Sequence, residues 1–205
     1  MNDVLEAIER IKVVPVVVIN DVGETLPLMK ALVEGDVPVA EITFRTPCAA
    51  EAIRVASSSF PDAIVGAGTV IDAKQAEEAI EAGAKFLVSP GLSEEVYAVA
   101  KEKNVPYLPG VVTPTEVMKA LSLGLDHLKF FPAGVYGGLK AINALGSVFP
   151  NVSFMPTGGV GLENLSEFVS NKRIFAVGGS FLTKGGYDDI KKNCLKARAI
   201  VKENL

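Results

Sequence analysis

The feature that most constrains the fold is a regular alternation of short apolar runs with longer stretches of helical periodicity. Apolar runs without a two-residue period are typical of parallel strands whose outer face is covered by helices. We expect strands at residues 13–19, 37–44, 64–67, 85–89, 105–108, 127–131, 152–156 and 174–177. We expect helices at residues 4–12 before the first strand, at 73–83, 94–104, 114–124 and 139–145 between strands, and at 188–204 after the last strand.

These repeated strand–helix units predict the fold class. Eight units of roughly 25 residues fill the 205-residue chain, which matches a compact α/β fold, a (β/α)₈ TIM barrel with an N-terminal helix. The alternative is a doubly wound open sheet, which usually carries a G-x-G-x-x-G turn after its first strand, whereas residues 19–23 are INDVG. No linker or low-complexity tract interrupts residues 1–205, so we expect one domain. Gly35, Gly83 and Gly124 are expected to end helices in the left-handed conformation.

Composition excludes several functional classes. Hydrophobic residues make up 49% of the chain, and 20 Lys and Arg against 24 Asp and Glu give a net charge of −4. Such a chain buries a core, and mild acidity without a basic run argues against nucleic acid or an anionic membrane as a partner. No apolar run approaches the roughly 18 residues that a membrane span needs. The N-terminus lacks the segments of a secretory signal, so we expect a cytoplasmic protein.

The chain is poor in the residues that common catalytic and metal sites use. Its two cysteines, Cys48 and Cys194, are expected to be free thiols, with Cys48 contributing to packing. Its single histidine, His127, is expected to be partly exposed at the start of a strand. Because no Cys/His spacing suits zinc, we predict no metal centre, and the chemistry must come from other residue types.

A lysine lies within the sixth apolar run, in the segment LKFFP at residues 128–132. The two-residue period of a strand places Lys129 and Phe131 on one face and Leu128 and Phe130 on the other. An unpartnered ammonium group in the helix layer would be costly, so we expect Lys129 to point into the barrel near its open end. Removal from water favours a neutral amine, which can attack a carbonyl to form a Schiff base. The alternative is a structural ion pair.

The second apolar run ends in VAEITFR at residues 39–45, which places Glu41, Thr43 and Arg45 on one face of the strand. An acid and a guanidinium on one side of a buried strand suggest a proton shuttle at Glu41 and a clamp for a carboxylate at Arg45. The alternative is a structural pair of Glu41 with Arg45 or with Lys129. A direct Glu41–Arg45 pair is not expected, because four residues of a strand span about 13 Å.

Glycine-rich segments end three other strands. GAGT at residues 66–69 would allow close approach to the backbone and turn Thr69 toward the pocket. PTGGV at 156–160 and VGGS at 177–180 close the seventh and eighth strands, where barrels commonly bind phosphate through backbone N–H groups and a helix N-terminus. Ser180 would add a hydroxyl donor. Tight turns without a ligand are the alternative for all three segments.

In combination, these segments resemble a known enzyme family. They are, in chain order, EITFRT at 41–46, IVGAGTV at 64–70, VSPG at 88–91, KFFP at 129–132, PTGG at 156–159 and VGGS at 177–180. The combination resembles the 2-keto-3-deoxy-6-phosphogluconate (KDPG) aldolases, class I aldolases that are also described as 4-hydroxy-2-oxoglutarate aldolases. The likeness runs from about residue 13 to the C-terminus. The chain has INDVG at 19–23, where many members carry a basic residue.

The resemblance implies a (β/α)₈ barrel, usually a homotrimer, that needs no metal or other cofactor. It implies cleavage of KDPG to pyruvate and glyceraldehyde 3-phosphate, and of 4-hydroxy-2-oxoglutarate to pyruvate and glyoxylate. In these reactions Lys129 would form the Schiff base and Glu41 would move protons to and from the substrate. The expected substrate-binding residues are Arg45 and Thr69 at the pyruvyl carboxylate, Pro90 and Phe131 in the pocket wall, and Thr157, Gly158, Gly159, Gly179 and Ser180 toward the phosphate end. Thr157 matches the KDPG-type enzymes.

Two other functions are compatible with the same residues. A phosphate-barrel isomerase or epimerase would share the glycine segments but would need no Schiff-base lysine, so borohydride trapping would fail while a sugar phosphate still binds. A metabolite sensor would bind pyruvate or KDPG without turnover, and a coupled lactate dehydrogenase assay would separate it from an aldolase.

Overall fold

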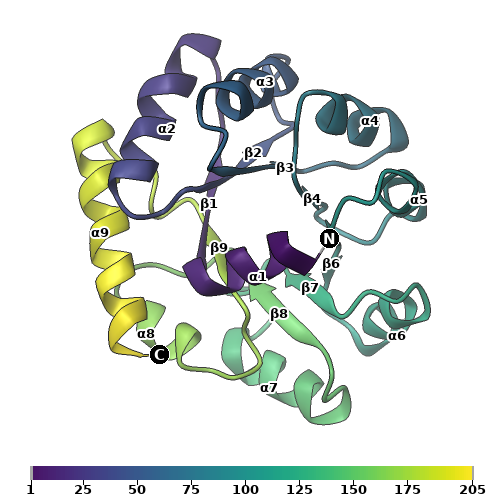
Figure 1. Cartoon of the computed structure of the whole chain (residues 1–205). Coiled ribbons are helices and arrows are strands. Elements are labelled where there is room, and N and C mark those ends of the chain that lie inside the picture. The colour runs from purple at the N-terminus through teal and green to yellow at the C-terminus, as the bar shows by residue number, and fades with distance from the viewer. Residues whose placement is uncertain (1, 205) are drawn as a thin grey trace.

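Parallel strands form the centre of the protein in this computed structural model, which describes residues 2–204. The strands are β1 (Val13–Val17), β2 (Val39–Thr43), β3 (Ile64–Gly68), β4 (Leu87–Val88), β5 (Tyr107–Leu108), β6 (Gly110–Val111), β7 (His127–Phe130), β8 (Ser153–Pro156) and β9 (Val177–Gly179). A six-stranded sheet has the order β5-β4-β3-β2-β1-β9, and a three-stranded sheet has the order β6-β7-β8. Two isolated parallel bridges, Phe154–Ile174 and Thr157–Gly178, connect β8 to the chain around β9. The strands therefore curl around a common centre (Figure 1).

Helices surround the strands on the outside (Figure 1). They are α2 (Thr25–Glu34), α3 (Ala49–Ser59), α4 (Ala73–Glu81), α5 (Glu94–Glu102), α6 (Pro114–Ser122), α7 (Gly138–Val148), α8 (Leu165–Val169) and α9 (Tyr187–Glu203), with a short 3₁₀ helix η1 (Val22–Glu24) before α2. Polar caps start several of them: Asp72, Ser93 and Thr113 each accept a hydrogen bond from a backbone N–H in the first turn of α4, α5 and α6. No helix within residues 2–204 is both long and apolar enough to cross a bilayer.

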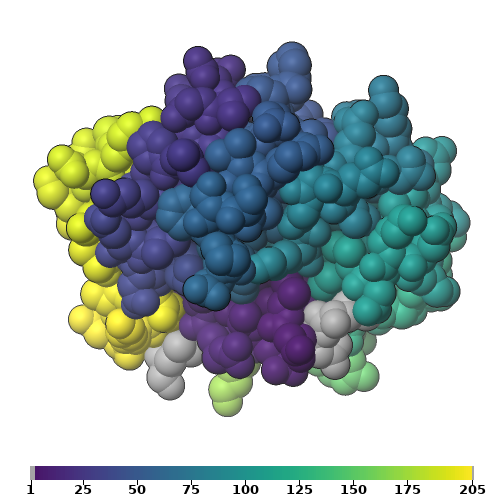
Figure 2. Space-filling model, turned by 45° about the horizontal axis from the view of Figure 1, so that its top comes forward, coloured from purple at the N-terminus to yellow at the C-terminus, as the bar shows by residue number. Residues whose placement is uncertain are grey.

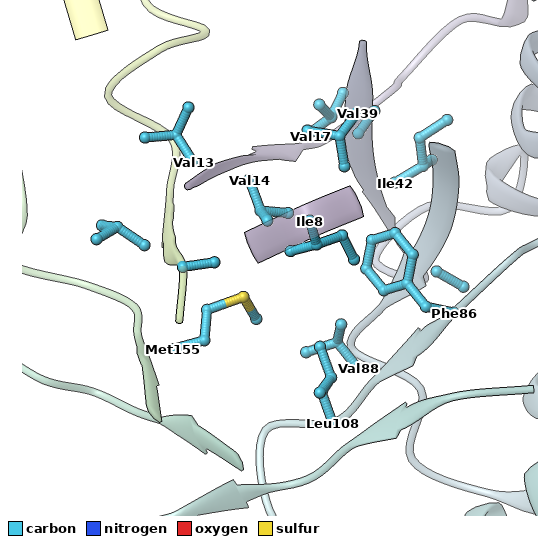
Figure 3. Packing of buried hydrophobic residues seen from close by; sticks show 14 of the residues in the cluster. Ile8, Val13, Val14, Val17, Val39, Ile42, Phe86, Val88, Leu108 and Met155 are labelled. Atoms are coloured by element: carbon cyan, nitrogen blue, oxygen red, sulfur yellow. The ribbon is translucent and has the colours of Figure 1, made fainter. Parts of the chain in front are cut away.

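The N-terminal helix α1 (Asn2–Ile11) lies across the end of the sheet where the strands begin. Its inner residue Ile8 is fully buried, whereas Glu6 and Glu9 are exposed, and the outer face of the helix is visible at the lower edge of Figure 2. Figure 3 shows Ile8, Phe86 and Met155 directed toward the same central space. Because α1 covers the amino ends of the strands, the open end is the carboxyl end, where sites form in such folds.

Each of the eight predicted strand positions contains or overlaps a strand, but the structure divides them into nine strands, and several are shorter than predicted. The predicted strand at 85–89 contains only two ladder residues, and the one at 105–108 continues into β6 after a break at Pro109. Proline lacks the N–H that a ladder needs, although its carbonyl still accepts a hydrogen bond from Lys129 N–H at 2.9 Å. The predicted strand at 174–177 begins only at Val177, since Ile174 N–H is bonded to Asn171 in a turn.

One of the three predicted glycine caps was wrong. Gly83 and Gly124 have positive φ angles of 101° and 78°, as expected, but Gly35 has a φ of −83°. The left-handed residue after α2 is Asp36, with a φ of 62°. Gly35 is required for packing instead, because a Cβ at this position would collide with the Cys194 side chain on α9.

Candidate active site

Lys129 on β7 and Glu41 on β2 meet on the inner side of the curled strands. The Lys129 Nζ lies 3.5 Å from the Glu41 Oε1. Lys129 is 2% exposed and Glu41 is fully buried, so this is an ion pair removed from water. The prediction that Lys129 points to the inner side of its strand is confirmed, and the alternative position in the helix layer is excluded.

Strand register and missing side chains make room for this pair. Glu41 is the register partner of Gly66, and Lys129 is the partner of Gly110 and Met155. A Cβ at Gly68 would collide with the Glu41 carboxylate, which shows that the carboxylate occupies the space that a side chain at the end of β3 would fill. The GAGT segment therefore has a steric function in addition to its turn: it admits the acid from the neighbouring strand.

The Glu41 carboxylate has an unusual hydrogen-bond environment. Both of its oxygens are buried and have no hydrogen-bond partner within residues 2–204. Buried polar atoms are nearly always paired, and a carboxylate without hydrogen bonds is costly to maintain. The remaining contact is the ion pair with Lys129. The two oxygens are thus available to a polar group of a bound substrate, as proton transfer would require.

Arg45 and Thr69 were predicted to act at the same end of the pocket, and the structure brings them together. The Arg45 Nε donates to the Thr69 Oγ1 at 3.0 Å. Thr69 has a positive φ of 56°, which is uncommon for a β-branched residue, and it directly follows β3. Thr43, on the same strand as Glu41, donates to the carbonyl of Val17 at 2.9 Å and so ties β2 to β1.

The predicted wall residues differ in how closely they approach the lysine. The Phe131 ring centroid lies 4.9 Å from the Lys129 Nζ, so this ring covers the amine from the same face of the chain. Pro90 is exposed and lines a small pocket of about 180 Å³ with Ser89 and Gly91. Tyr107 braces this turn by accepting a hydrogen bond from Ser93 N–H at 3.0 Å, and burial raises the pKa of its phenol.

The two glycine segments predicted for the phosphate end lie side by side. Thr157 is 5% exposed and forms a parallel bridge with Gly178, which places the PTGG segment against VGGS. Gly158 and Gly159 both have positive φ angles, 85° and 81°. Ser180 is exposed and lines a pocket of about 370 Å³ together with Glu24. Gly179 packs against the Phe181 ring, where a Cβ would collide.

No helix begins directly after either glycine segment, although Gly186 and Tyr187 at the start of α9 line the pocket beside Ser180. Helix α8 begins only at Leu165 and has five residues, and α9 begins at Tyr187. Turns separate both helices from the glycines. The PTGG segment itself therefore offers its loop backbone to an anion, and not the N-terminus of a helix.

One buried lysine, Lys12, carries no signal in the sequence. Lys12 is 8% exposed at the opposite end of the strands, and its Nζ donates to the Ile174 carbonyl at 2.9 Å. Burial lowers the pKa of Lys12, and nearby Glu9 opposes this shift. Lys12 lies between α1 and β1, at the end of the helix predicted for residues 4–12. No local pattern distinguishes it from the solvated lysines. Because a lowered pKa leaves a larger fraction of the amine neutral and able to attack, Lys12 is the natural comparison for Lys129.

His127, Cys48 and Cys194 have environments that indicate structural rather than catalytic roles. His127 is half-buried at the start of β7 with its Nδ1 2.7 Å from the Asp126 Oδ1, as predicted for a strand-start residue. Both cysteines are free; the Cys48 Sγ donates to the Ile19 carbonyl at 3.1 Å, and burial raises the pKa of Cys194 to about 12. Among residues 2–204, no group of three or more His, Cys, Asp or Glu side chains is placed to hold a metal ion.

A buried amine beside a carboxylate, at the open end of a parallel sheet wrapped in helices, is typical of enzymes that handle a carbonyl substrate through a Schiff base. A family model described as KDPG and KHG aldolase matches residues 4–197. The chain belongs to this aldolase family, whose members are carbon–carbon lyases.

Individual relatives agree with the family assignment. A 2-dehydro-3-deoxy-phosphogluconate aldolase of Dickeya dadantii (strain 3937) is 46% identical over 184 residues, which cover 87% of this chain and 86% of that protein. A KHG/KDPG aldolase of Escherichia coli (strain K12) is 44% identical over 186 residues, covering 88% and 87%. A crystal structure of a KDPG aldolase from Legionella pneumophila, with pyruvate captured at low pH as a covalent carbinolamine, is 36% identical and has a TM-score of 0.89 over 95% of this chain and 96% of that one.

Proposed function

We propose that this protein is a class I aldolase that cleaves KDPG to pyruvate and glyceraldehyde 3-phosphate, and 4-hydroxy-2-oxoglutarate to pyruvate and glyoxylate. The observation that carries the proposal is the buried pair of Lys129 and Glu41, with 3.5 Å between Nζ and Oε1. The names of the two sequence relatives support both substrates. The carbinolamine in the Legionella enzyme is the adduct of an amine and a carbonyl, which is the first covalent product on a Schiff-base pathway.

The reaction begins when Lys129 releases a proton and its neutral amine attacks the C2 carbonyl carbon of the substrate. A proton then returns to the hydroxyl of the carbinolamine, which leaves as water, and the resulting iminium ion withdraws electrons from the C3–C4 bond. Glu41 accepts the proton of the C4 hydroxyl as this bond breaks, the aldehyde leaves, and the bonding electrons remain in an enamine. Glu41 then returns a proton to C3, and water hydrolyses the resulting iminium to release pyruvate and free Lys129.

The ends of the substrate determine its orientation in the site. Arg45 and Thr69, joined by their 3.0 Å hydrogen bond, would hold the pyruvyl carboxylate, with Pro90 in the wall of that end. The Phe131 ring, 4.9 Å from the amine, would exclude water from the imine. The remaining predicted substrate contacts lie toward the phosphate: Thr157, Gly158, Gly159, Gly179 and Ser180.

The reaction is tested by trapping the imine. Borohydride reduction in the presence of pyruvate is expected to add one reduced pyruvyl group, which peptide mapping by mass spectrometry assigns to Lys129. Lys12 is the internal comparison, because burial lowers its pKa while its distance from the open end keeps it out of contact with substrate. An adduct on Lys12, or no adduct, would contradict the scheme.

The alternative functions give different results in borohydride trapping and in the coupled lactate dehydrogenase assay. An isomerase or epimerase would bind a sugar phosphate and leave no borohydride adduct. A sensor would be trapped by pyruvate but would release no pyruvate from KDPG in a coupled lactate dehydrogenase assay.

We infer further that residues 1–205 form one domain, a closed (β/α)₈ barrel that works as a cytoplasmic homotrimer. The bridges Phe154–Ile174 and Thr157–Gly178 between the two sheets support closure of the barrel. Exposed apolar side chains, such as Ile71 at 56% and Met118 at 62%, support burial of part of this surface between subunits. Light scattering is expected to give three times the 21.6 kDa chain mass, and a monomer at micromolar concentration would contradict this assembly.

A further inference from the structure

One side-chain amide clamps the loop that follows β8. The Asn164 Nδ2 donates to the Gly159 carbonyl at 3.1 Å, and the Asn164 Oδ1 accepts from Gly161 N–H at 2.9 Å. The backbone N–H of Asn164 also donates to the Gly161 carbonyl at 3.3 Å. Only an amide of this length combines a donor and an acceptor in these places, because aspartate lacks the donor and alanine lacks both.

The clamped loop has little conformational preference of its own. Gly158 and Gly159 are consecutive residues with positive φ, and glycine populates many backbone states at similar energy. On its other side the loop packs against the turn after β7, where Gly134 N–H donates to the Gly158 carbonyl at 2.9 Å. A Cβ on Gly159 would be 2.7 Å from the Gly134 Cα, so no side chain can replace the clamp from within the loop.

Fixing the carbonyls also fixes the direction of the N–H groups. A trans peptide points its C=O and N–H in opposite directions, so holding the Gly158 and Gly159 carbonyls sets the N–H groups of the residues that follow. The parallel bridge between Thr157 and Gly178 engages the Gly158 N–H, whereas the N–H groups of Gly159 and Val160 donate to no acceptor within residues 2–204. Consecutive unpaired N–H groups in a turn are a typical anion site.

A pocket lies beside Ser180, two residues beyond Gly178, which is the bridge partner of Thr157. It is lined by Glu24, Thr183 and Tyr187 among others, and by no lysine or arginine of residues 2–204. A dianionic phosphoryl group bound at this end would therefore depend on backbone N–H groups and hydroxyls, whose strength depends on their orientation.

We propose that Asn164 is a positioning residue for the phosphoryl end of the substrate. It does not contact the reacting atoms; it orients the loop at residues 158–161 so that its N–H groups face a phosphoryl group. This inference rests on the proposed function, since it assumes that the glycine loop binds the phosphorylated end of KDPG.

The test compares two substrates of one active site. In Asn164→Ala, KM for KDPG is expected to rise by about 10-fold, the equivalent of one or two lost hydrogen bonds to an anion. The kcat/KM for 4-hydroxy-2-oxoglutarate, which has no phosphoryl group, is expected to stay within about twofold, since the loop that Asn164 orients would contact only the phosphoryl group. The inhibition constant of inorganic phosphate, measured against 4-hydroxy-2-oxoglutarate cleavage, should rise by the same factor as KM for KDPG.

Asn171→Ala is the matched control. Asn171 lies after the other end of α8, where its Nδ2 donates to the Asn143 Oδ1 at 2.8 Å and its Oδ1 accepts from Arg173 N–H at 2.9 Å. The two variants lose equivalent hydrogen bonds, but only Asn164→Ala should change the ratio of kcat/KM for KDPG to kcat/KM for 4-hydroxy-2-oxoglutarate. Asn164→Asp keeps the acceptor and loses the donor, and is expected to raise KM for KDPG at least as much as alanine does.

Each result has a separate meaning. Equal losses on both substrates, or no loss on either, would overturn the role of Asn164 while leaving the aldolase intact. If the wild-type chain cleaves neither substrate, the proposed function fails, and calorimetric binding of inorganic phosphate to wild type and Asn164→Asp still tests the clamp. Unchanged phosphate affinity in that comparison overturns the inference.

Discussion

Substitution of Lys129 by methionine is expected to lower kcat for KDPG cleavage by about 10⁴-fold or more, because it removes the nucleophile on which every covalent step depends. Methionine has a similar length and is apolar, so it can fill the space of a side chain that is 2% exposed. Steady-state kinetics with the coupled assay measure the loss. Borohydride with pyruvate should leave this variant without an adduct.

Lys12→Met is the control for this result. It is the same chemical change at a second buried lysine, and it removes the hydrogen bond to the Ile174 carbonyl, which costs about 1 kcal/mol of stability. We expect the melting temperature to fall while kcat stays within about twofold of wild type, because Lys12 lies at the closed end of the strands. Residual cleavage in Lys129→Met near the level of Lys12→Met would show that another group performs the attack.

The centre of the site could be predicted from the sequence because strand geometry is periodic. A lysine in an apolar run has only two faces to choose from, and the cost of an unpartnered charge in the helix layer decides between them. The same period placed Glu41 on one face of β2 with Thr43 and Arg45, and a pair of Glu41 with Lys129 was among the alternatives; the structure shows these two side chains 3.5 Å apart. The association of Arg45 with Thr69, by contrast, came from the family resemblance and not from the pattern.

Features that depend on contacts between distant segments could not be predicted in this way. The packing of Gly35 against Cys194 joins α2 to α9, and nothing local to either residue signals it. The burial of Lys12 depends on the Ile174 carbonyl, which is far away in the sequence. In the sequence, nothing distinguishes Asn164 from an ordinary turn residue, because its side-chain hydrogen bonds to the backbone of Gly159 and Gly161 exist only in the folded loop.

Substitution of Glu41 by glutamine is expected to lower kcat by about 10²–10⁴-fold, the usual contribution of a positioned acid or base. Glutamine has nearly the same shape, so it fits the fully buried site but cannot accept a proton at its amide. Imine formation on Lys129 should survive, and borohydride with pyruvate should still give the adduct. Exchange of the pyruvate methyl protons in D₂O, followed by NMR, should slow with kcat because both require proton transfer at C3.

Gly68→Ala tests the same role with the carboxylate still present. The added Cβ would collide with the Glu41 carboxylate and move it away from its position 3.5 Å from the Lys129 Nζ. Activity and methyl-proton exchange should both fall, because a proton transfer depends on hydrogen-bond reach. Gly91→Ala is the comparison at a loop glycine with open space around its Cβ position. Because it moves no group near Glu41, it should leave the rate of exchange at saturating pyruvate unchanged. If Glu41→Gln and Gly68→Ala both exchange methyl protons at the wild-type rate, the proton shuttle must be a different group, even where Lys129 is confirmed as the nucleophile.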